Sequence, residues 1–284
     1  MTGAPTLAVA GSTGHLGGVV ARLLAEAGTP QRLLVRDLRR APDLEHADPV
    51  VVSYADPVLA KAALEGVTTL FMVSAAEAED RLQQHYTFVD AAAAAGVRHV
   101  VYTSFFGAAA DSVFTLGRDH FATEEHIEAS GMDFTFLRDN FYLDFLPLLT
   151  GADGVIRGPA GDGVMAAVAR ADIARSAVTV LRDPALHVGR SYDLTGPEDI
   201  SLATAAELLT AGTGRTITFH DETLEEAYAS RASYGAPPWQ VDAWVSTYTA
   251  IAAGELAGPT SAVHELTGRE PLGLAQFLAE SHTI

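Results

Sequence analysis

The sequence of 284 residues predicts an α/β fold, with a doubly wound parallel sheet in its first half and a small α-rich lobe after it. Short apolar runs of β type alternate with Ala- and Leu-rich helical runs from residue 6 to about residue 139, which is typical of βαβ units. A glycine-rich turn directly follows the first apolar run. After about residue 150, strand patterns become sparse and helical segments dominate.

Six apolar runs are the expected strands of the sheet. They are TLAVAG (6–11), RLLVR (32–36), PVVVSY (49–54), TTLFMVS (68–74), HVVYTSF (99–105) and DFTFLRD (133–139). The first five are nearly continuous hydrophobic runs, as expected of strands that are covered on both faces. Helices are expected between them at about 15–27, 57–65, 78–95 and 117–130. This alternation implies parallel strands joined by right-handed crossovers.

The expected domain organisation divides the chain at about residue 150. Residues 1–150 form the sheet domain, and residues 151–284 form the lobe, with segments that return to the core sheet. In the lobe, SLATAAELLTAGTG (201–214) predicts a helix capped by Ser201, and RTITFHD (215–221) predicts a strand. Two more helices are separated by the sequence APP (236–238).

Composition and charge limit the classes of partner. The chain has 18 basic and 36 acidic residues, a formal charge of −18, so phosphate backbones and anionic membranes repel it. We therefore expect neither a nucleic-acid nor a membrane partner. There is no cysteine, which removes disulfide and thiolate chemistry. The sequence shows no signal peptide and no apolar run long enough to span a bilayer, so we expect a cytoplasmic protein.

The glycine-rich turn has the spacing G-x-x-G-x-x-G between a strand and a helix. In this setting the glycines permit a tight turn, a close approach of pyrophosphate to the backbone, and close packing of helix on strand. The turn therefore predicts a dinucleotide cradle rather than a turn without a ligand. Its expected cofactor-binding residues are Gly11, Ser12, Thr13, Gly14, His15, Leu16 and Gly17, and the first domain is expected to be a Rossmann-type core that binds NAD(P).

The end of the second strand indicates which dinucleotide is bound. An acidic residue there would accept hydrogen bonds from the ribose hydroxyls of NAD. Here Arg36 occupies this place, with Arg39 and Arg40 just beyond it, and a guanidinium suits a 2′-phosphate. We therefore expect NADP(H). Asp37 leaves NAD(H) open as an alternative, and at least one of Arg39 and Arg40 is expected to be merely solvated.

Several motifs together resemble the NmrA-like branch of the atypical short-chain dehydrogenases. They are Gly11–Gly17, Arg36, YTS (102–104), HFATEEHIEASG (120–131), FLRDNFY (136–142), RADIA (170–174), YDLTG (192–196) and TGREPLGLAQFL (267–278). The nearest subgroup is that of NAD(P)H quinone oxidoreductases and triphenylmethane-dye reductases. The resemblance covers nearly the whole chain and implies a Rossmann core, a small C-terminal substrate lobe and a substrate site over the nicotinamide.

The usual catalytic residues of short-chain dehydrogenases are absent. No Tyr-x-x-x-Lys follows the fifth strand, and Lys61 is the only lysine in the chain. Candidate catalytic residues are instead Ser104, Asn140, and His120 with Glu124, which share a helix face at a spacing of i and i+4. A His–Glu pair that only packs the helix is the alternative. Further expected cofactor contacts are Ser74, Thr103, Ser104 and Asn140.

Aromatic residues near strand ends are the candidate substrate contacts. Phe105, Phe106, Phe141 and Tyr142 follow the fifth and sixth strands, where open parallel sheets bind ligands, and they can stack on a flat ring. Trp239, with Trp244 and Tyr248, is a candidate for a substrate lid. Core packing is the alternative for each aromatic residue.

Two acidic residues depart from the pattern that the resemblance implies. Relatives often carry an Asp near Ser53 and Tyr54 that would contact the adenine, but in this sequence the carboxylate comes later, at Asp56. Asp139 separates Arg138 from Asn140. A carboxylate there could disfavour anionic substrates or act as a base.

The function expected from these observations is hydride transfer from NADPH to a quinone or related planar aromatic substrate, without metal or flavin. His120 and His126 are six residues apart on a helix and cannot share a metal. The alternatives are a tailoring reductase of aromatic polyketide metabolism and a non-catalytic sensor of dinucleotides. A homodimer is possible.

Overall fold

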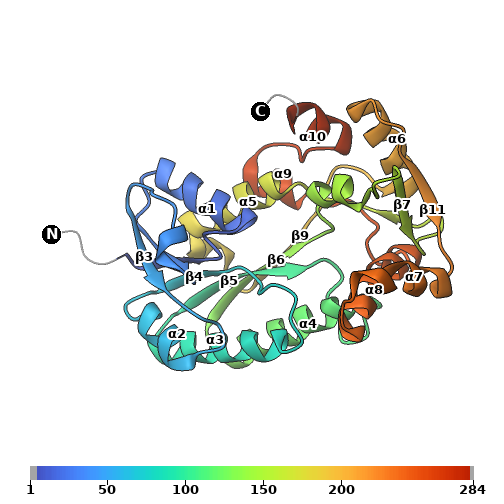
Figure 1. Ribbon diagram of the computed structural model, residues 1–284. Helices are drawn as coiled ribbons and strands as arrows, with labels where there is room; N and C mark the ends of the chain where they lie inside the picture. The colour runs from blue at the N-terminus through green and yellow to red at the C-terminus, as the bar shows by residue number, and fades with distance from the viewer. Residues whose placement is uncertain (1–4, 282–284) are drawn as a thin grey trace. The chain divides into compact units, whose positions relative to one another are not determined.

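The computed structural model describes residues 5–281, and its central feature is a seven-stranded sheet with the order β3-β2-β1-β4-β5-β6-β9 (Figure 1). The strands are β1 (Leu7–Ala10), β2 (Gln31–Val35), β3 (Ala47–Val51), β4 (Thr69–Met72), β5 (His99–Phe105), β6 (Asp133–Asp139) and β9 (Arg190–Leu194). The pairs β2/β3, β1/β2, β1/β4 and β4/β5 are parallel. The first six strands follow the Rossmann order, which confirms the predicted fold class.

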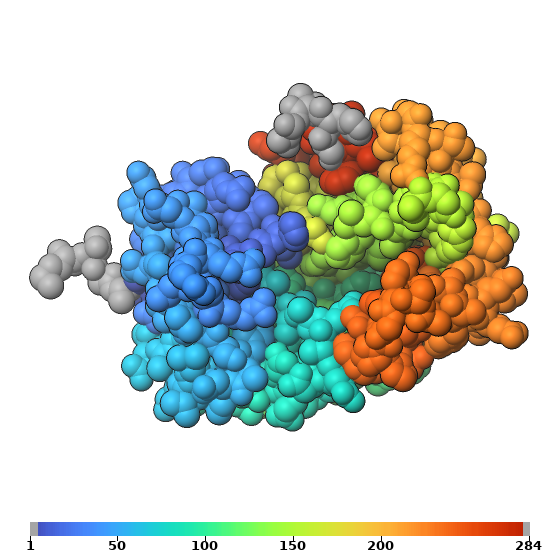
Figure 2. All heavy atoms as spheres, in the orientation of Figure 1, coloured from blue at the N-terminus to red at the C-terminus, as the bar shows by residue number. Residues whose placement is uncertain are grey.

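Helices cover both faces of this sheet. Figure 1 shows α1 and α5 on one face and α2, α3 and α4 on the other. Their bounds are α1 (His15–Glu26), α2 (Pro57–Leu64), α3 (Arg81–Ala95), α4 (Thr115–Ala129) and α5 (Arg170–Arg182). The bounds of α1, α2 and α4 agree with the sequence prediction to within two residues, whereas α3 begins three residues later than expected. The outer side of α2 lies on the surface (light blue in Figure 2), where Val58 is exposed.

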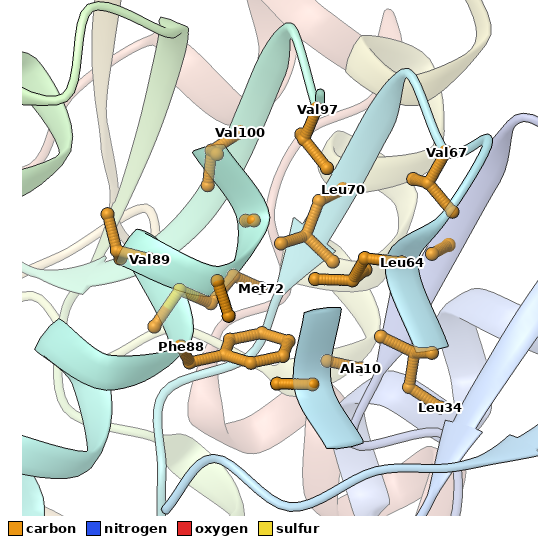
Figure 3. Packing of buried hydrophobic residues seen from close by; sticks show 14 of the residues in the cluster. Ala10, Leu34, Leu64, Val67, Leu70, Met72, Phe88, Val89, Val97 and Val100 are labelled. Atoms are coloured by element: carbon orange, nitrogen blue, oxygen red, sulfur yellow. The ribbon is translucent and has the colours of Figure 1, made fainter. Parts of the chain in front are cut away.

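The core under α2 and α3 consists of apolar side chains from both helices and from the sheet. Phe88 of α3 lies at its centre with Leu64 of α2 and Met72 of β4 (Figure 3), and all three side chains are fully buried. The strands contribute alternate side chains to this core, which are Ala8 and Ala10 from β1, Leu70 and Met72 from β4, and Val100 and Tyr102 from β5. This packing fixes the carboxyl ends of the strands, from which the candidate site residues extend.

The expectation that the first five strands are covered on both faces is wrong for β3. This strand is the sheet edge, and its Asp48 and Pro49 are exposed. Proline lacks an N–H and is tolerated at an edge, where it also discourages pairing with another chain. The run of valines predicted a buried strand because hydrophobicity alone does not distinguish an edge strand from a central one.

By internal contacts the chain divides into two compact units that interleave along the sequence. The first comprises residues 1–104, 121–138 and 173–192, and the second comprises residues 105–120, 139–172 and 193–284. The expected division at residue 150 stays a prediction. The segments near residues 104 and 138, where β5 and β6 pass from one unit to the other, are also those that carry candidate site residues.

The second unit has its own small sheets and core. The strand β8 (Val164–Met165) pairs antiparallel with β10 (Ile200–Ser201), and β7 (Val155–Gly158) pairs parallel with β11 (Thr218–Asp221). The helices are α6 (Leu202–Thr213), α7 (Leu224–Arg231), α8 (Pro238–Ala252), α9 (Ala262–Thr267) and α10 (Leu274–Ser281), and short 3-10 helices are η1 (Leu38–Arg40), η2 (Leu143–Leu149), η3 (Pro184–His187) and η4 (Ala232–Tyr234). The predicted cap is present, because the Ser201 side chain accepts from the Thr204 N–H. Among residues 5–281, no helix is long and apolar enough to cross a membrane.

Candidate active site

The glycine-rich turn has the geometry of a phosphate cradle. Gly11 has a φ of +65°, which a residue with a side chain rarely adopts, and its carbonyl accepts from the Gly14 N–H at 2.8 Å. A Cβ on Gly17 would lie 2.4 Å from the Gly11 oxygen, so the helix packs too closely on the turn for any side chain. Gly14 occupies the N-cap of α1 and offers no side chain to the helix N–H groups, which leaves these donors for an anion.

The other residues of this turn have different environments. Leu16 is buried in the core, whereas His15 is exposed and Thr13 is half-buried. Ser12 is buried, and its hydroxyl donates to the Leu34 carbonyl at 3.4 Å. The backbone of the turn and the side chains of Thr13 and His15 are therefore the groups within it that a ligand can reach.

The turn after β2 contains the two residues, Arg36 and Asp37, on which the choice between the two candidate cofactors depends. Both carboxylate oxygens of Asp37 are bound by Arg39, through Nε at 3.0 Å and Nη2 at 2.8 Å. This hydrogen bonding lowers the pKa of Asp37, and the carboxylate also caps η1 through the Arg39 N–H. Arg36 is exposed and makes no hydrogen bond or ion pair within the described part of the chain. The acidic group is thus occupied, and the guanidinium of Arg36 is available.

Asp56, the carboxylate displaced along the sequence, caps a helix. Its Oδ1 accepts from the N–H groups of Val58 and Leu59 at 3.0 and 2.9 Å. These bonds satisfy two donors of the first turn of α2. Asp56 therefore has a structural function in this chain.

The segment Val73–Ala75, directly after β4, is held by side chains from three neighbouring parts of the first unit. Thr103 Oγ1 accepts from the Ser74 N–H at 2.9 Å, so two predicted cofactor residues bind each other. Tyr54 donates to the Val73 carbonyl at 2.7 Å. His85 Nε2 accepts from the Ala75 N–H at 2.8 Å, and Arg81 Nε donates to the Ala75 carbonyl at 3.0 Å. We call this segment with its bound side chains the Val73–Ala75 clamp.

Tyr54, Arg81 and His85 are not among the candidate site residues that the sequence indicates, although all three bind the Val73–Ala75 backbone. A signal was present in α3, where Arg81 and His85 lie one turn apart on a helix that otherwise packs apolar side chains into the core. Both side chains are buried, with exposed fractions of 3% and 0%. Buried polar groups of this kind need partners, and the sequence does not reveal which groups those partners are.

Ser104 and Glu124, two candidate catalytic residues of the first unit, differ in their hydrogen bonding. Ser104 is buried at the end of β5, and its hydroxyl has no hydrogen-bond partner within residues 5–281. Glu124 is also buried, but Arg138 binds both of its carboxylate oxygens, through Nε at 2.9 Å and Nη2 at 2.5 Å. Glu124 therefore has the environment of a packing residue, while the Ser104 hydroxyl is a buried polar group whose hydrogen-bonding capacity is unused within residues 5–281. Their catalytic roles stay predictions.

His120 and Asn140, the candidate catalytic residues of the second unit, are both buried. The His120 ring lies 6.0 Å from that of Phe105, measured between centroids. The Asn140 Nδ2 donates to the Leu256 carbonyl at 3.0 Å, and its Oδ1 accepts from the Phe141 N–H at 2.7 Å. These bonds fix the side chain of Asn140 and leave the second hydrogen of its amide for another acceptor.

Asp139 is a buried carboxyl with an incomplete set of partners. The Tyr142 hydroxyl donates to its Oδ2 at 3.0 Å, whereas Oδ1 has no hydrogen-bond partner within residues 5–281. Burial raises the pKa of Asp139 well above its ordinary value, and the bond from Tyr142 only partly opposes this. A carboxyl in such a site holds its proton more tightly than one in water.

The candidate substrate aromatics fall into two groups within the second unit. Phe105, Phe106 and Phe141 are partly buried against its hydrophobic cluster, in which Tyr248 is buried as a core residue. Tyr142 alone forms the second group: its ring stacks on Phe145, which was not a candidate, and the Arg170 guanidinium lies over both rings, at 5.0 and 4.4 Å from their centroids. Trp239 and Trp244 are half-buried on α8. The lid role of these α8 residues stays a prediction.

No cluster of three or more His, Asp or Glu residues that could hold a metal ion occurs in the part of the chain that the structure describes. His126, six residues after His120, instead contacts Asp90 through Nε2 at 2.8 Å. Its ring also stacks on Tyr86 at a centroid separation of 4.3 Å.

Comparison with known proteins places this chain among reductases. The NmrA-like family matches residues 4–234. The NAD(P)H azoreductase of Xenophilus azovorans is 34% identical over 280 residues, with 96% of each chain covered. Quinone oxidoreductase 2 of Escherichia coli (strain K12) is 31% identical over 280 residues, with 96% of this chain and 97% of the relative covered.

Solved structures of two reductases share the fold over nearly their whole length. The NADPH-dependent quinone oxidoreductase QOR2 of Escherichia coli, in complex with NADPH, has a TM-score of 0.88 and 29% identity, covering 97% of this chain and 99% of the other. The triphenylmethane reductase of Citrobacter sp. has a TM-score of 0.85 and 27% identity, covering 98% and 100%. The chain therefore belongs to the NmrA-like family, and it is an oxidoreductase.

Proposed function

We propose that this oxidoreductase takes a hydride from NADPH and delivers it to a quinone or a related planar aromatic acceptor. The observation that carries the choice of NADPH is the turn after β2. Arg36 is exposed and available, while Arg39 occupies Asp37, the group that would favour NADH. Relatives named as NAD(P)H azoreductase and as quinone oxidoreductase support the same reaction class.

The residues of the first unit suit this cofactor. The uncapped N–H groups at the start of α1 would bind its pyrophosphate, and Arg36 would bind the 2′-phosphate. The buried Ser104 hydroxyl has no partner within residues 5–281, and a ligand that bonded to it would remove the cost of this unsatisfied group. When bound, the cofactor supplies a hydride and thereby two electrons.

The choice of acceptor rests on aromatic residues and charge. Phe105, Phe106, Phe141 and Tyr142 offer faces on which a flat, uncharged ring can stack. The formal charge of −18 disfavours anionic acceptors. Reduction of a quinone to a hydroquinone requires one proton besides the hydride: quinone, NADPH and H⁺ give hydroquinone and NADP⁺. In this proposal solvent supplies that proton, since the chain lacks the Tyr-x-x-x-Lys pair.

The test is oxidation of NADPH and of NADH by the purified protein with simple quinones, a polycyclic quinone, an azo dye and a triphenylmethane dye. We expect turnover with at least one quinone and a preference for NADPH. Binding of NADPH without turnover of any acceptor would support a dinucleotide sensor instead. Selective turnover of the polycyclic quinone would favour a tailoring reductase. Failure to bind either dinucleotide would contradict the proposal as a whole.

A further inference from the structure

The Val73–Ala75 clamp is unusual because each of three consecutive residues has a backbone group bound by a side chain distant in sequence. Tyr54 binds the Val73 carbonyl, Thr103 the Ser74 N–H, and His85 and Arg81 the two polar groups of Ala75. The four bonds have donor–acceptor distances between 2.7 and 3.0 Å. Loops are usually mobile, but in this segment side chains of the protein hold four of the polar backbone groups.

The hydrogen bonds of His85 define its tautomer. The Ala75 N–H can only donate, so Nε2 must carry the lone pair, and the proton of a neutral ring is then on Nδ1. Nδ1 lies 2.9 Å from Thr123 Oγ1 and donates to it. Burial lowers the pKa of His85 well below its ordinary value, and the charge of Arg81 adds to this. The ring is therefore neutral, as the bond from Ala75 requires.

The clamp lies beside the glycine-rich turn. Strands β1 and β4 are parallel neighbours, so the segments after their carboxyl ends emerge at the same edge of the sheet. The two segments also touch closely, because a Cβ on Gly11 would lie 3.1 Å from the Val73 Cβ. A displacement of Val73–Ala75 would therefore disturb the space beside Gly11, where the cradle begins.

We propose that His85 is a positioning residue for the cofactor site, and that its bonds to Ala75 and Thr123 hold the Val73–Ala75 segment against the glycine-rich turn before any ligand binds. The inference rests on the proposed binding of NADPH. It adds that affinity for NADPH depends on a buried residue of α3 that has no contact with the ligand. A loop ordered in advance does not lose conformational freedom upon binding, and this strengthens affinity.

Two variants of His85 separate this role from general stability. In His85→Gln the amide oxygen takes the place of Nε2 and can still accept from the Ala75 N–H, whereas the shorter side chain of His85→Asn reaches only the place of Nδ1. We expect His85→Asn to raise the Kd of NADPH about tenfold and to speed hydrogen exchange of the Ala75 amide by about the same factor, as loss of one buried hydrogen bond implies. His85→Gln should stay within about threefold of wild type in both measurements.

Controls keep the test decisive. Val97→Ala removes volume from the same core away from the clamp, and at a similar loss of thermal stability it should leave NADPH affinity unchanged. If His85→Asn does not fold, Tyr54→Phe deletes only the hydroxyl on the Val73 carbonyl and should raise Kd about threefold. Unchanged affinity in the folded clamp variants, or an equal loss in Val97→Ala, would overturn the positioning role. Absence of NADPH binding by wild type would instead contradict the proposed function, and would be seen first.

Discussion

Two neighbouring segments follow the carboxyl ends of β1 and β4, and they differ in whether side chains bind their backbone polar groups. At the glycine-rich turn, the N–H groups that begin α1 have no side-chain acceptor within residues 5–281, because Gly14 occupies the N-cap. In the Val73–Ala75 clamp, the half-buried Tyr54 and the buried Thr103 and His85 bind the backbone of Val73, Ser74 and Ala75 in turn. We call the first segment open, because its N–H groups are left for a ligand, and the second closed, because side chains already bind its backbone. The two differ although β1 and β4 lie side by side.

This difference indicates how a binding site can offer unoccupied hydrogen-bond donors to a ligand and still be rigid. Open donors attract an anion, but they require a turn that does not rearrange when no ligand is present. The close packing of Gly17 on Gly11 and of Val73 on Gly11 supplies that rigidity. The second unit adds a different case, in which Asp139 is buried yet keeps one oxygen without a partner within residues 5–281.

The largest expected effect comes from adding a methyl group to the glycine-rich turn at Gly17. In Gly17→Ala the new Cβ would lie 2.4 Å from the Gly11 oxygen and 2.6 Å from the Ala10 oxygen, so the backbone must move. We expect a loss of about 3 kcal/mol in the free energy of unfolding and about 100-fold weaker NADPH binding. Chemical denaturation and fluorescence titration measure the two.

The matched control is Gly18→Ala, one residue further along α1. Its Cβ would lie 3.1 Å from the Ser12 oxygen, a contact that a small shift relieves, and alanine favours the helix by about 1 kcal/mol. We expect little change in stability or affinity. Equal behaviour of the two variants would show that the close packing at Gly17 is not what shapes the cradle.

The second effect concerns the open guanidinium of Arg36. Arg36→Gln should raise the Kd of NADPH about 10- to 100-fold, the usual range for hydrogen bonds to a charged group, and should leave the Kd of NADH unchanged. Arg39→Gln is the matched control, because it frees the Asp37 carboxylate. Arg39→Gln should strengthen NADH binding, and it should weaken NADPH binding less than Arg36→Gln does. A larger loss of NADPH affinity in Arg39→Gln would identify Arg39 as the phosphate ligand.

The third effect tests whether Glu124 stabilises the fold or takes part in the reaction. Arg138 binds both oxygens of its carboxylate. Glu124→Gln should lower the free energy of unfolding by about 1–3 kcal/mol while kcat stays within about threefold of wild type. Arg138→Met should be more destabilising, since it leaves a buried carboxylate without its partner. A large fall in kcat for Glu124→Gln, with a changed pH profile, would instead show that Glu124 takes part in the reaction.

The smallest effect concerns Asp139 and has a defined dependence on pH. Its pKa is raised in the folded protein by burial, so the folded state binds the proton more tightly than the unfolded state, and stability is lost as pH rises from the unfolded pKa towards the folded one. Asp139→Asn, which cannot ionise, should match wild type in Tm at low pH and exceed it increasingly towards neutral pH. A difference that is constant with pH would contradict the raised pKa.

Much of the fold followed from local patterns. The predicted bounds of β5 and β6 agree with the structure residue for residue, and Ser201 caps α6 as expected. Hydrophobic periodicity and capping depend on neighbours in sequence, which is why they are predictable. The environment of β3 was not predictable in this way, because its place at the sheet edge depends on strand order.

The sequence by itself determined the glycine-rich turn, the strand before it, the helix after it and the position of Arg36, since each depends on a few adjacent residues. The tertiary structure alone decided which polar groups are open and which are closed. Thr103 binds Ser74 across 29 residues, and His85 reaches Thr123 across 38. The physical reason is that a buried polar side chain must find a partner, and packing of distant elements chooses that partner.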